Sequence, residues 1–195
     1  NEEELNTTKK LCSSDVNVHV YPFDLNNIPQ ITELVKQICN DTGRLDGLLY
    51  AAGIEKTLPY LNIKPETYTD VYNINFVAAM EMVRVLSKKS YRNESTKFVL
   101  ISSITASIGR PGVAAYAASK GALISATKTL AIEMAPKGLN INCISPGTVL
   151  TPMVKNFLET LSPEQQEARK KGFPLGLGMP EDISSTAIFL LSDAA

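Results

Sequence analysis

Strand-like and helix-like patterns alternate along the whole chain, and this alternation constrains the fold more than any other feature. Short apolar or alternating runs predict strands over 16–21, 48–51, 98–101 and 139–144. Apolar residues at helical spacing predict helices between and after them, over 2–12, 31–42, 65–89, 114–135, 152–160, 163–171 and 180–191. Strands that alternate with helices predict an α/β fold, a doubly wound parallel sheet with helices on both faces.

Size and composition fit one domain spanning residues 1–195. The chain has 195 residues, 44% of them hydrophobic, and 19 basic residues nearly balance 20 acidic ones. This balance argues against nucleic acid or a membrane surface as a partner. No apolar run approaches the roughly 20 residues that span a bilayer, and no signal peptide is visible. Three scattered cysteines and one histidine lack metal-ligand spacing, so we expect a cytoplasmic protein without a metal site.

The ends of the predicted strands mark the place to look for a site. Ligands of open α/β sheets bind outside the carboxyl ends of the strands. Here these ends fall at Asp24, Gly53, Ser103 and the Pro146–Gly147 turn. We therefore expect these four positions to lie at one edge of the sheet.

A tyrosine and a lysine share one face of the alanine-rich helix predicted over 114–135. Tyr116 and Lys120 are four residues apart. A phenol has a pKa of ~10, and a nearby ammonium favours its ionised form, so this pair suits proton transfer to and from an alcohol. Tyr60 and Lys64 have the same spacing, but prolines flank them and the segment cannot be helical throughout.

Ser103 supplies context for this pair. It follows the strand predicted over 98–101, thirteen residues before Tyr116, and its hydroxyl can hydrogen-bond a substrate oxygen. A serine hydrolase is the competing interpretation. That chemistry needs a histidine or lysine base, and His19 lies elsewhere in the chain, without a Gly-x-Ser-x-Gly elbow. We therefore favour proton transfer over hydrolysis.

Taken together, the motifs resemble the short-chain dehydrogenase/reductase family, of the simple single-domain Rossmann-like type. The matching stretches are Ile101-Ser-Ser103, Tyr116-Ala-Ala-Ser-Lys120, Asn140 to Thr151, Asn73-Ile-Asn75, Gly43 to Gly53, Pro174-Leu-Gly176 and Pro180 to Ile183. They cover essentially the whole chain in the family's order. Within the family, the bulk of the chain resembles 3-oxoacyl-acyl-carrier-protein reductases, a subgroup whose motifs are shared with reductases of sugars, polyols and steroids.

The resemblance implies a role for each matching residue. Tyr116 is the catalytic acid/base, Ser103 polarises the substrate oxygen, Lys120 binds the nicotinamide ribose and tunes the tyrosine, and Asn75 holds a water in a proton relay. The cofactor-binding set also includes Asp24 at the adenine with its neighbour Leu25, Ala52 and Gly53 near the adenosine ribose, and Pro146, Gly147, Val149 and Thr151 at the carboxamide. Considered alone, Asn75 could equally well cap or brace a kink in a helix, and Pro146–Gly147 could equally well be only a turn.

The sequence departs from the family pattern in two places. The Asn-Asn-Ala-Gly motif reads Tyr50-Ala-Ala-Gly53, which removes both asparagine side chains. The glycine-rich phosphate loop is missing, and Gly172, Gly176 and Gly178 imitate its spacing after a charged run instead of a strand. We expect a strand-helix-strand unit of roughly 40–50 residues to precede this sequence in the protein, and a short strand to follow it.

These inferences predict an NAD(P)-dependent oxidoreductase acting on a ketone or secondary alcohol. The cofactor is expected to be NADP(H) or NAD(H), and NADPH is favoured. A substrate bound to a carrier protein also stays open. Substrate choice is expected from 104–113 and 152–172, and Arg110 is interpreted as a surface residue or an anion contact. The alternative is a non-catalytic, NAD(P)-sensing protein on the same fold. The resemblance also implies a homotetramer built by the helices over 65–89 and 114–135.

Overall fold

A computed structural model gives the backbone of residues 1–195 and every side chain except those of Met153 and Lys170. Its helices and strands follow the predicted alternation closely. In chain order they are α1 (Glu2–Leu11), η1 (Ile28–Gln30), α2 (Ile31–Thr42), β1 (Leu45–Tyr50), η2 (Tyr60–Asn62), α3 (Pro65–Tyr72), η3 (Asn73–Val77), α4 (Ala78–Leu86), β2 (Arg92–Ile101), η4 (Ile104–Ala106), α5 (Ala114–Met134), η5 (Ala135–Lys137), β3 (Leu139–Ile144), α6 (Pro152–Glu159), α7 (Pro163–Lys171) and α8 (Pro180–Leu191).

The three strands form one parallel sheet in the order β1-β2-β3. Leu48 lies opposite Phe98, and Phe98 lies opposite Ile141, so the apolar centres of the strands are in register. β2 is central and is buried on both faces, which explains its continuous apolar run. The carboxyl ends of all three strands consequently point to the same edge.

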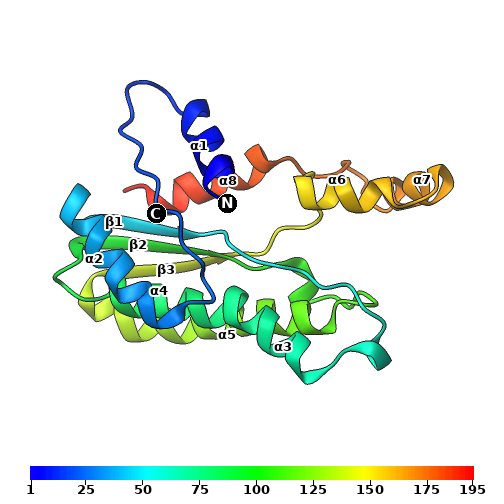
Figure 1. Ribbon diagram of the computed structural model, residues 1–195, viewed down its shortest axis with the longest axis horizontal. Helices are drawn as coiled ribbons and strands as arrows, with labels where there is room; N and C mark the ends of the chain where they lie inside the picture. The colour runs from blue at the N-terminus through cyan, green and yellow to red at the C-terminus, as the bar shows by residue number, and fades with distance from the viewer.

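Helices cover both faces of this sheet (Figure 1). α4 and α5 pack below it in the view, with α3 beside α5 and α2 beside α4, whereas α8 crosses the opposite face. Phe98, Leu100, Leu123 and Leu139 are fully buried between these layers. The expected α/β fold with a parallel sheet is confirmed. No helix of the structure, over the residues it describes, is long and apolar enough to cross a membrane.

The strand expected over 16–21 is absent, and this prediction was wrong. Residues 17–24 belong to no helix or strand, and Val16 is exposed. Alternating valines give a strand only where a neighbouring strand supplies backbone partners, and none of the three strands lies against this segment. The other strands are present, with β1 and β2 beginning earlier than their apolar runs because pairing continues through Leu45 and Arg92.

The helix expected over 65–89 is continuous but contains a wider turn. α3 begins at Pro65, and α4 ends at Leu86, with the π-helical turn η3 between them. The Ala78 N–H donates to the Asn73 carbonyl, five residues back, instead of the usual four. This turn carries Asn75, whose side chain is fully buried. Turns of this kind are frequent at functional sites.

Candidate active site

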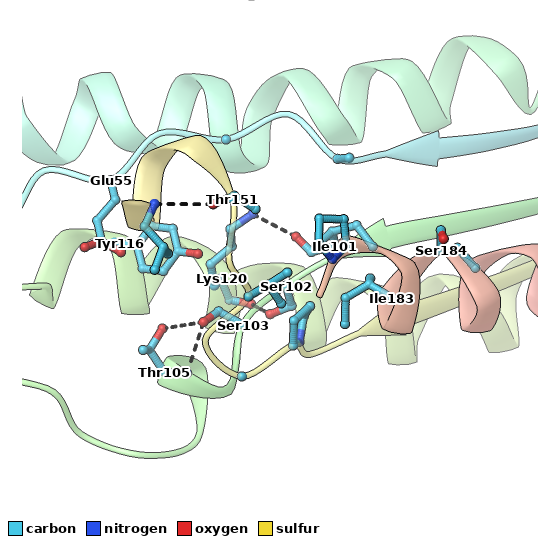
Figure 2. A pocket seen from close by; sticks show the side chains of 18 of the residues that line it. Glu55, Ile101, Ser102, Ser103, Thr105, Tyr116, Lys120, Thr151, Ile183 and Ser184 are labelled. Atoms are coloured by element: carbon cyan, nitrogen blue, oxygen red, sulfur yellow. Dashed lines mark hydrogen bonds between the residues drawn. The ribbon is translucent and has the colours of Figure 1, made fainter. Parts of the chain in front are cut away.

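A pocket of about 410 Å³ opens at the carboxyl ends of the three strands. It collects most of the residues singled out from the sequence, together with groups from the loop after β1 and from α8 (Figure 2). Its lining residues are Leu49, Ala51, Gly53, Glu55, Ile101, Ser102, Ser103, Thr105, Arg110, Tyr116, Lys120, Pro146, Gly147, Val149, Thr151, Val154, Pro180, Ile183, Ser184 and Ala187. The sheet edge expected to hold the site therefore does hold a cavity.

Ser103 sits where β2 gives way to the short helix η4. It caps η4 in an extended conformation, and its Oγ accepts hydrogen bonds from the Thr105 N–H (3.2 Å) and the Thr105 hydroxyl (2.9 Å). These two bonds fix the serine oxygen in the pocket that Tyr116 also lines. Ser103 is only 8% exposed. The serine hydroxyl is thus held in place beside the phenol.

Lys120 approaches Tyr116 from one turn further along α5. Its Nζ lies 5.7 Å from the centre of the tyrosine ring and donates to the Ile101 carbonyl at 2.7 Å. The side chain is 3% exposed, and burial lowers the pKa of the ammonium to about 8. The bond to Ile101 uses one of three N–H donors, so the other two are available to a ligand in the pocket.

The pKa of Tyr116 moves opposite to the expectation. Burial raises the pKa of the phenol, and the Glu55 carboxylate adds to this, whereas the hydrogen bond with Ser103 and the Arg110 guanidinium lower it. The sequence argument relied on Lys120 to lower it. In the folded chain desolvation outweighs the favourable partners, because charging a buried phenol is costly.

Asn75 locks the π-turn to the end of β1. Its Oδ1 accepts from the Ile54 N–H at 2.8 Å, and its Nδ2 donates to the Ile54 carbonyl (3.0 Å) and to the Ser119 hydroxyl (2.9 Å). Gly53 passes so close that a β-carbon there would lie 3.2 Å from Lys120 Nζ and 3.3 Å from Asn75 Oδ1. Helix, strand end and Lys120 are therefore packed closely together, and a side chain at Gly53 would force Lys120 or Asn75 to shift.

The loop from Pro146 to Thr151 forms another wall of the pocket. The Pro146 carbonyl accepts from the Ile104 N–H at 2.9 Å, and Val149 pairs with Gly178 in a parallel bridge. Thr151 caps α6 by accepting from the Val154 N–H. Space beside Gly147 is open, with no atom within 4 Å of the position of a β-carbon. A flat ring can approach the backbone there.

Three of the expected cofactor contacts lie outside this pocket. Asp24 is exposed, and its Oδ1 accepts from the Asn26 N–H at 3.0 Å. Leu25 and Ala52 pack against the hydrophobic core. The adenine-side roles of these residues stay predictions, since the pocket does not bring them together with Tyr116.

Two sequence patterns that resemble functional motifs, the Tyr60–Lys64 pair and the glycines at 172–178, do not have the geometry of those motifs. Tyr60 lies in η2, and Lys64 is extended ahead of α3, so that pair does not share a helix. Gly172 follows α7, and Gly178 pairs with Val149 instead of opening a phosphate loop. Among the described side chains, no group of three potential metal ligands is present.

Two parts of the pocket escaped the sequence argument. Glu55 and the α8 residues Pro180, Ile183 and Ser184 all line it. Glu55 belongs to no motif. The start of α8, Pro180 to Ile183, was recognised as matching the family but was not assigned to the site. Of the stretches expected to select substrate, 104–113 contributes Thr105 and Arg110, and the described side chains of 152–172 contribute Val154.

Sequence comparisons agree with the geometry. The family model described as "Enoyl-(Acyl carrier protein) reductase" matches residues 1–195. A Rickettsia bellii protein named 3-oxoacyl-(acyl-carrier-protein) reductase FabG is 36% identical over 195 residues, covering 98% of this chain and 76% of the relative. A Rickettsia conorii protein of the same name is 33% identical over 196 residues, covering 100% and 77%.

Solved structures share the fold as well. A short-chain type dehydrogenase/reductase from Mycobacterium ulcerans superimposes with a TM-score of 0.88 at 27% identity, covering 99% of this chain and 70% of that one. A 4-hydroxyisoleucine dehydrogenase complexed with NADH gives a TM-score of 0.74 at 30% identity, covering 90% and 73%. With the family model, the relatives and the fold in agreement, the chain belongs to the short-chain dehydrogenase/reductase family of NAD(P)-dependent oxidoreductases.

Proposed function

We propose that this protein interconverts a ketone and a secondary alcohol, with Tyr116 as the acid/base and Ser103 as the group that binds the substrate oxygen. The observation that carries the proposal is the cluster at the pocket floor, where Ser103, Tyr116 and Lys120 converge (Figure 2). Each of the three is at least largely buried. Such a cluster suits proton transfer at an oxygen atom, away from bulk water.

The residues present fit a nicotinamide cofactor. Lys120 has N–H donors left for ribose hydroxyls, and the open backbone at Gly147 accepts a flat ring beside Thr151. When bound, nicotinamide supplies hydride to the carbonyl carbon or accepts it from the alcohol carbon. We favour NADPH as the reductant. The relatives named as 3-oxoacyl-carrier-protein reductases make a 3-oxoacyl thioester the first substrate to try.

The chain's own residues then handle the proton. In reduction, the Ser103 hydroxyl hydrogen-bonds the carbonyl oxygen, and the Tyr116 O–H bond breaks as its proton passes to that oxygen. In oxidation, the Tyr116 phenolate takes the proton back. Because burial raises the pKa of Tyr116, the protonated form that reduction needs persists to higher pH than for a free phenol. The hydrogen bond with Ser103 and the Arg110 guanidinium act the other way and favour the phenolate that oxidation needs.

Replacing Tyr116 by phenylalanine tests the proposal. The Tyr116→Phe variant of the full-length protein is expected to lose at least about 100-fold in kcat, because proton transfer is removed. Its affinity for NADPH, measured by fluorescence titration, is expected to stay near that of the wild type. A panel of ketones and 3-oxoacyl thioesters supplies the substrates.

Two results would count against this assignment. Substantial turnover by Tyr116→Phe would show that the phenol is not the acid/base. Tight NADPH binding by the wild type, with no oxidation of NADPH in the presence of any carbonyl compound of the panel, would favour a non-catalytic, cofactor-sensing protein.

We further propose a homotetramer assembled through α3, α4 and α5.

A further inference from the structure

We propose that the ion pair between Glu55 and Arg110 sets the charge of substrate that the pocket accepts, selecting a neutral carbonyl compound over an anionic one. This inference rests on the proposed function and specifies its substrate class. Both residues line the same pocket as Tyr116. Glu55 lies just beyond β1, and Arg110 lies in the loop that leads into α5.

Hydrogen bonds within and between the two loops hold the Glu55–Arg110 pair in place. Arg110 Nη2 donates to Glu55 Oε1, and the Thr57 hydroxyl donates to the same oxygen at 2.9 Å. The two loops are also joined through their backbones, because the Leu58 N–H donates to the Gly112 carbonyl at 2.8 Å. Gly112 has a φ of +82°, and the Thr57 methyl group would lie 3.1 Å from a β-carbon there. The two side chains consequently face the pocket in a fixed arrangement.

Burial gives this pair more influence than an ordinary surface salt bridge. The Arg110 and Glu55 side chains are 32% and 21% exposed. Lys56 and Asp70, a second pair that starts from the same loop, are 40% and 54% exposed and lie outside the pocket lining. Charges in a partly desolvated pocket interact more strongly than those in bulk water. Arg110 is thus part of the pocket wall, and the interpretation of it as a plain surface arginine was wrong.

The pair cancels the charge at this end of the pocket. Glu55 offsets the positive charge of Arg110, and the remaining guanidinium donors and carboxylate lone pairs can bind a neutral polar group. An anionic substrate would meet the Glu55 carboxylate together with the guanidinium and would gain little. A free Arg110 in the pocket that Lys120 also lines would instead attract anions. The carboxylate of Glu55 is therefore what favours neutral substrates.

The same two charges act on Tyr116 in opposite directions. Tyr116 is faced by Ser103 and Glu55, by Arg110, and by Lys120 on its own helix, with Cys143 of β3 near that lysine. Glu55 raises the pKa of the phenol, and Arg110 lowers it. Removing either partner therefore has a second, independent consequence, a shift in the pH at which alcohol oxidation begins.

A matched pair of substrates tests the proposal in the full-length enzyme with NADPH. Ethyl 3-oxobutanoate and 3-oxobutanoate share the reacting ketone and differ in charge. We expect wild type to favour the ester, Glu55→Gln to raise the acid-to-ester ratio of kcat/KM roughly ten-fold, and Arg110→Gln to lower it. For the corresponding alcohols, the pH of half-maximal oxidation should fall in Glu55→Gln and rise in Arg110→Gln. Asp70→Asn, which removes the neighbouring pair, is the control and should change neither quantity.

The outcomes separate the two proposals. If the ester is reduced but neither variant changes the acid-to-ester ratio beyond Asp70→Asn, or both change it in the same direction, the inference is overturned and the proposed function stands. If the wild type reduces no ketone of the panel, the proposed function fails and the inference fails with it. Opposite changes in the ratio, with opposite pH shifts, support the inference, because a merely structural role for the loops would move both variants alike.

Discussion

Burial shifts the pKa values of two ionisable groups in the pocket. Burial raises the pKa of the Tyr116 phenol and lowers that of the Lys120 ammonium, so both are shifted toward their neutral forms. The spacing of these residues in the sequence identified the pair. It did not give the direction of the tyrosine's shift, because the competition between desolvation and partner charges depends on the depth of the pocket.

The free energy of unfolding is expected to depend on pH because the Lys120 ammonium is buried. The pKa of Lys120 is about 8 in the folded chain, against 10.5 for an ordinary lysine. Below pH 8 the folded state holds an unfavourable charge, and between pH 8 and 10.5 it has lost the proton that the unfolded chain still binds. The free energy of unfolding contributed by this group therefore rises with pH through that window, by about 3 kcal/mol.

Comparison with Lys120→Met isolates this effect. Urea unfolding of wild type and variant, followed from pH 7 to 10.5, should show the wild type gaining stability relative to the variant. Lys128 is an exposed lysine on the same helix, and the Lys128→Met difference should stay level over the same range. A Lys120→Met difference that also stays level would mean that the ammonium is better solvated than the structure indicates.

Residues outside motifs were the ones that the sequence could not identify. Ser103, Tyr116 and Lys120 occupy recognisable spacings, and the pocket contains all three. Glu55 follows Gly53 in a stretch without a pattern, and its importance depends on Arg110, 55 residues away. Such a pair becomes visible only when the fold brings the two loops together.

At the scale of helices and strands, local sequence patterns predicted most of the helices and strands and the residues at which several helices begin or end. α2 ends at Gly43, whose φ is +84°, and α3 begins at a proline, as their terminal residues indicated. The two differences are tertiary in origin. The segment 16–21 lacks a strand partner, and η3 widens the helix where the buried side chain of Asn75 bonds to Ile54.

Two glycines, one just before β3 and one inside α5, should respond oppositely to replacement by alanine. Gly138 has a φ of +74°, and a β-carbon there would lie 2.7 Å from the Glu94 carbonyl oxygen. We expect Gly138→Ala to lower the free energy of unfolding by at least ~1 kcal/mol. Gly121 lies inside α5 with open space around it, and Gly121→Ala should raise that free energy by roughly 0.5–1 kcal/mol. Urea denaturation measures both, and equal effects would contradict the prediction.

At the scale of the whole molecule, the sheet has an outer edge along β1, where Leu49 is 44% exposed. Exposed strand edges offer unpaired backbone groups to a further strand. The strand-helix-strand unit expected from the sequence would supply such a strand, and it stays a prediction. The family resemblance was what suggested it, because nothing in the pattern of these residues defines which strands are neighbours.

The proposed tetramer is also tested at this scale. Ile132 is a large apolar residue on α5 and is 80% exposed in the single chain. If α5 packs against its counterpart in a second copy, Ile132→Glu should lower the molar mass measured by light scattering, whereas Ile132→Val should not. Wild-type protein that elutes as a monomer would overturn the proposal. An Ile132→Glu variant of unchanged molar mass would show that α5 does not pack against a second copy through Ile132.

The double hydrogen bond between Asn75 and Ile54 has a consequence for motion. The asparagine carboxamide turns one N–H donor and its oxygen acceptor toward the Ile54 backbone, so the chain just after β1 is bonded as if a further strand residue lay beside it. The Ile54 amide lies outside any strand yet should exchange its hydrogen with solvent as slowly as the amides of the sheet. The end of β1 and the helix turn beneath the pocket would then open only together.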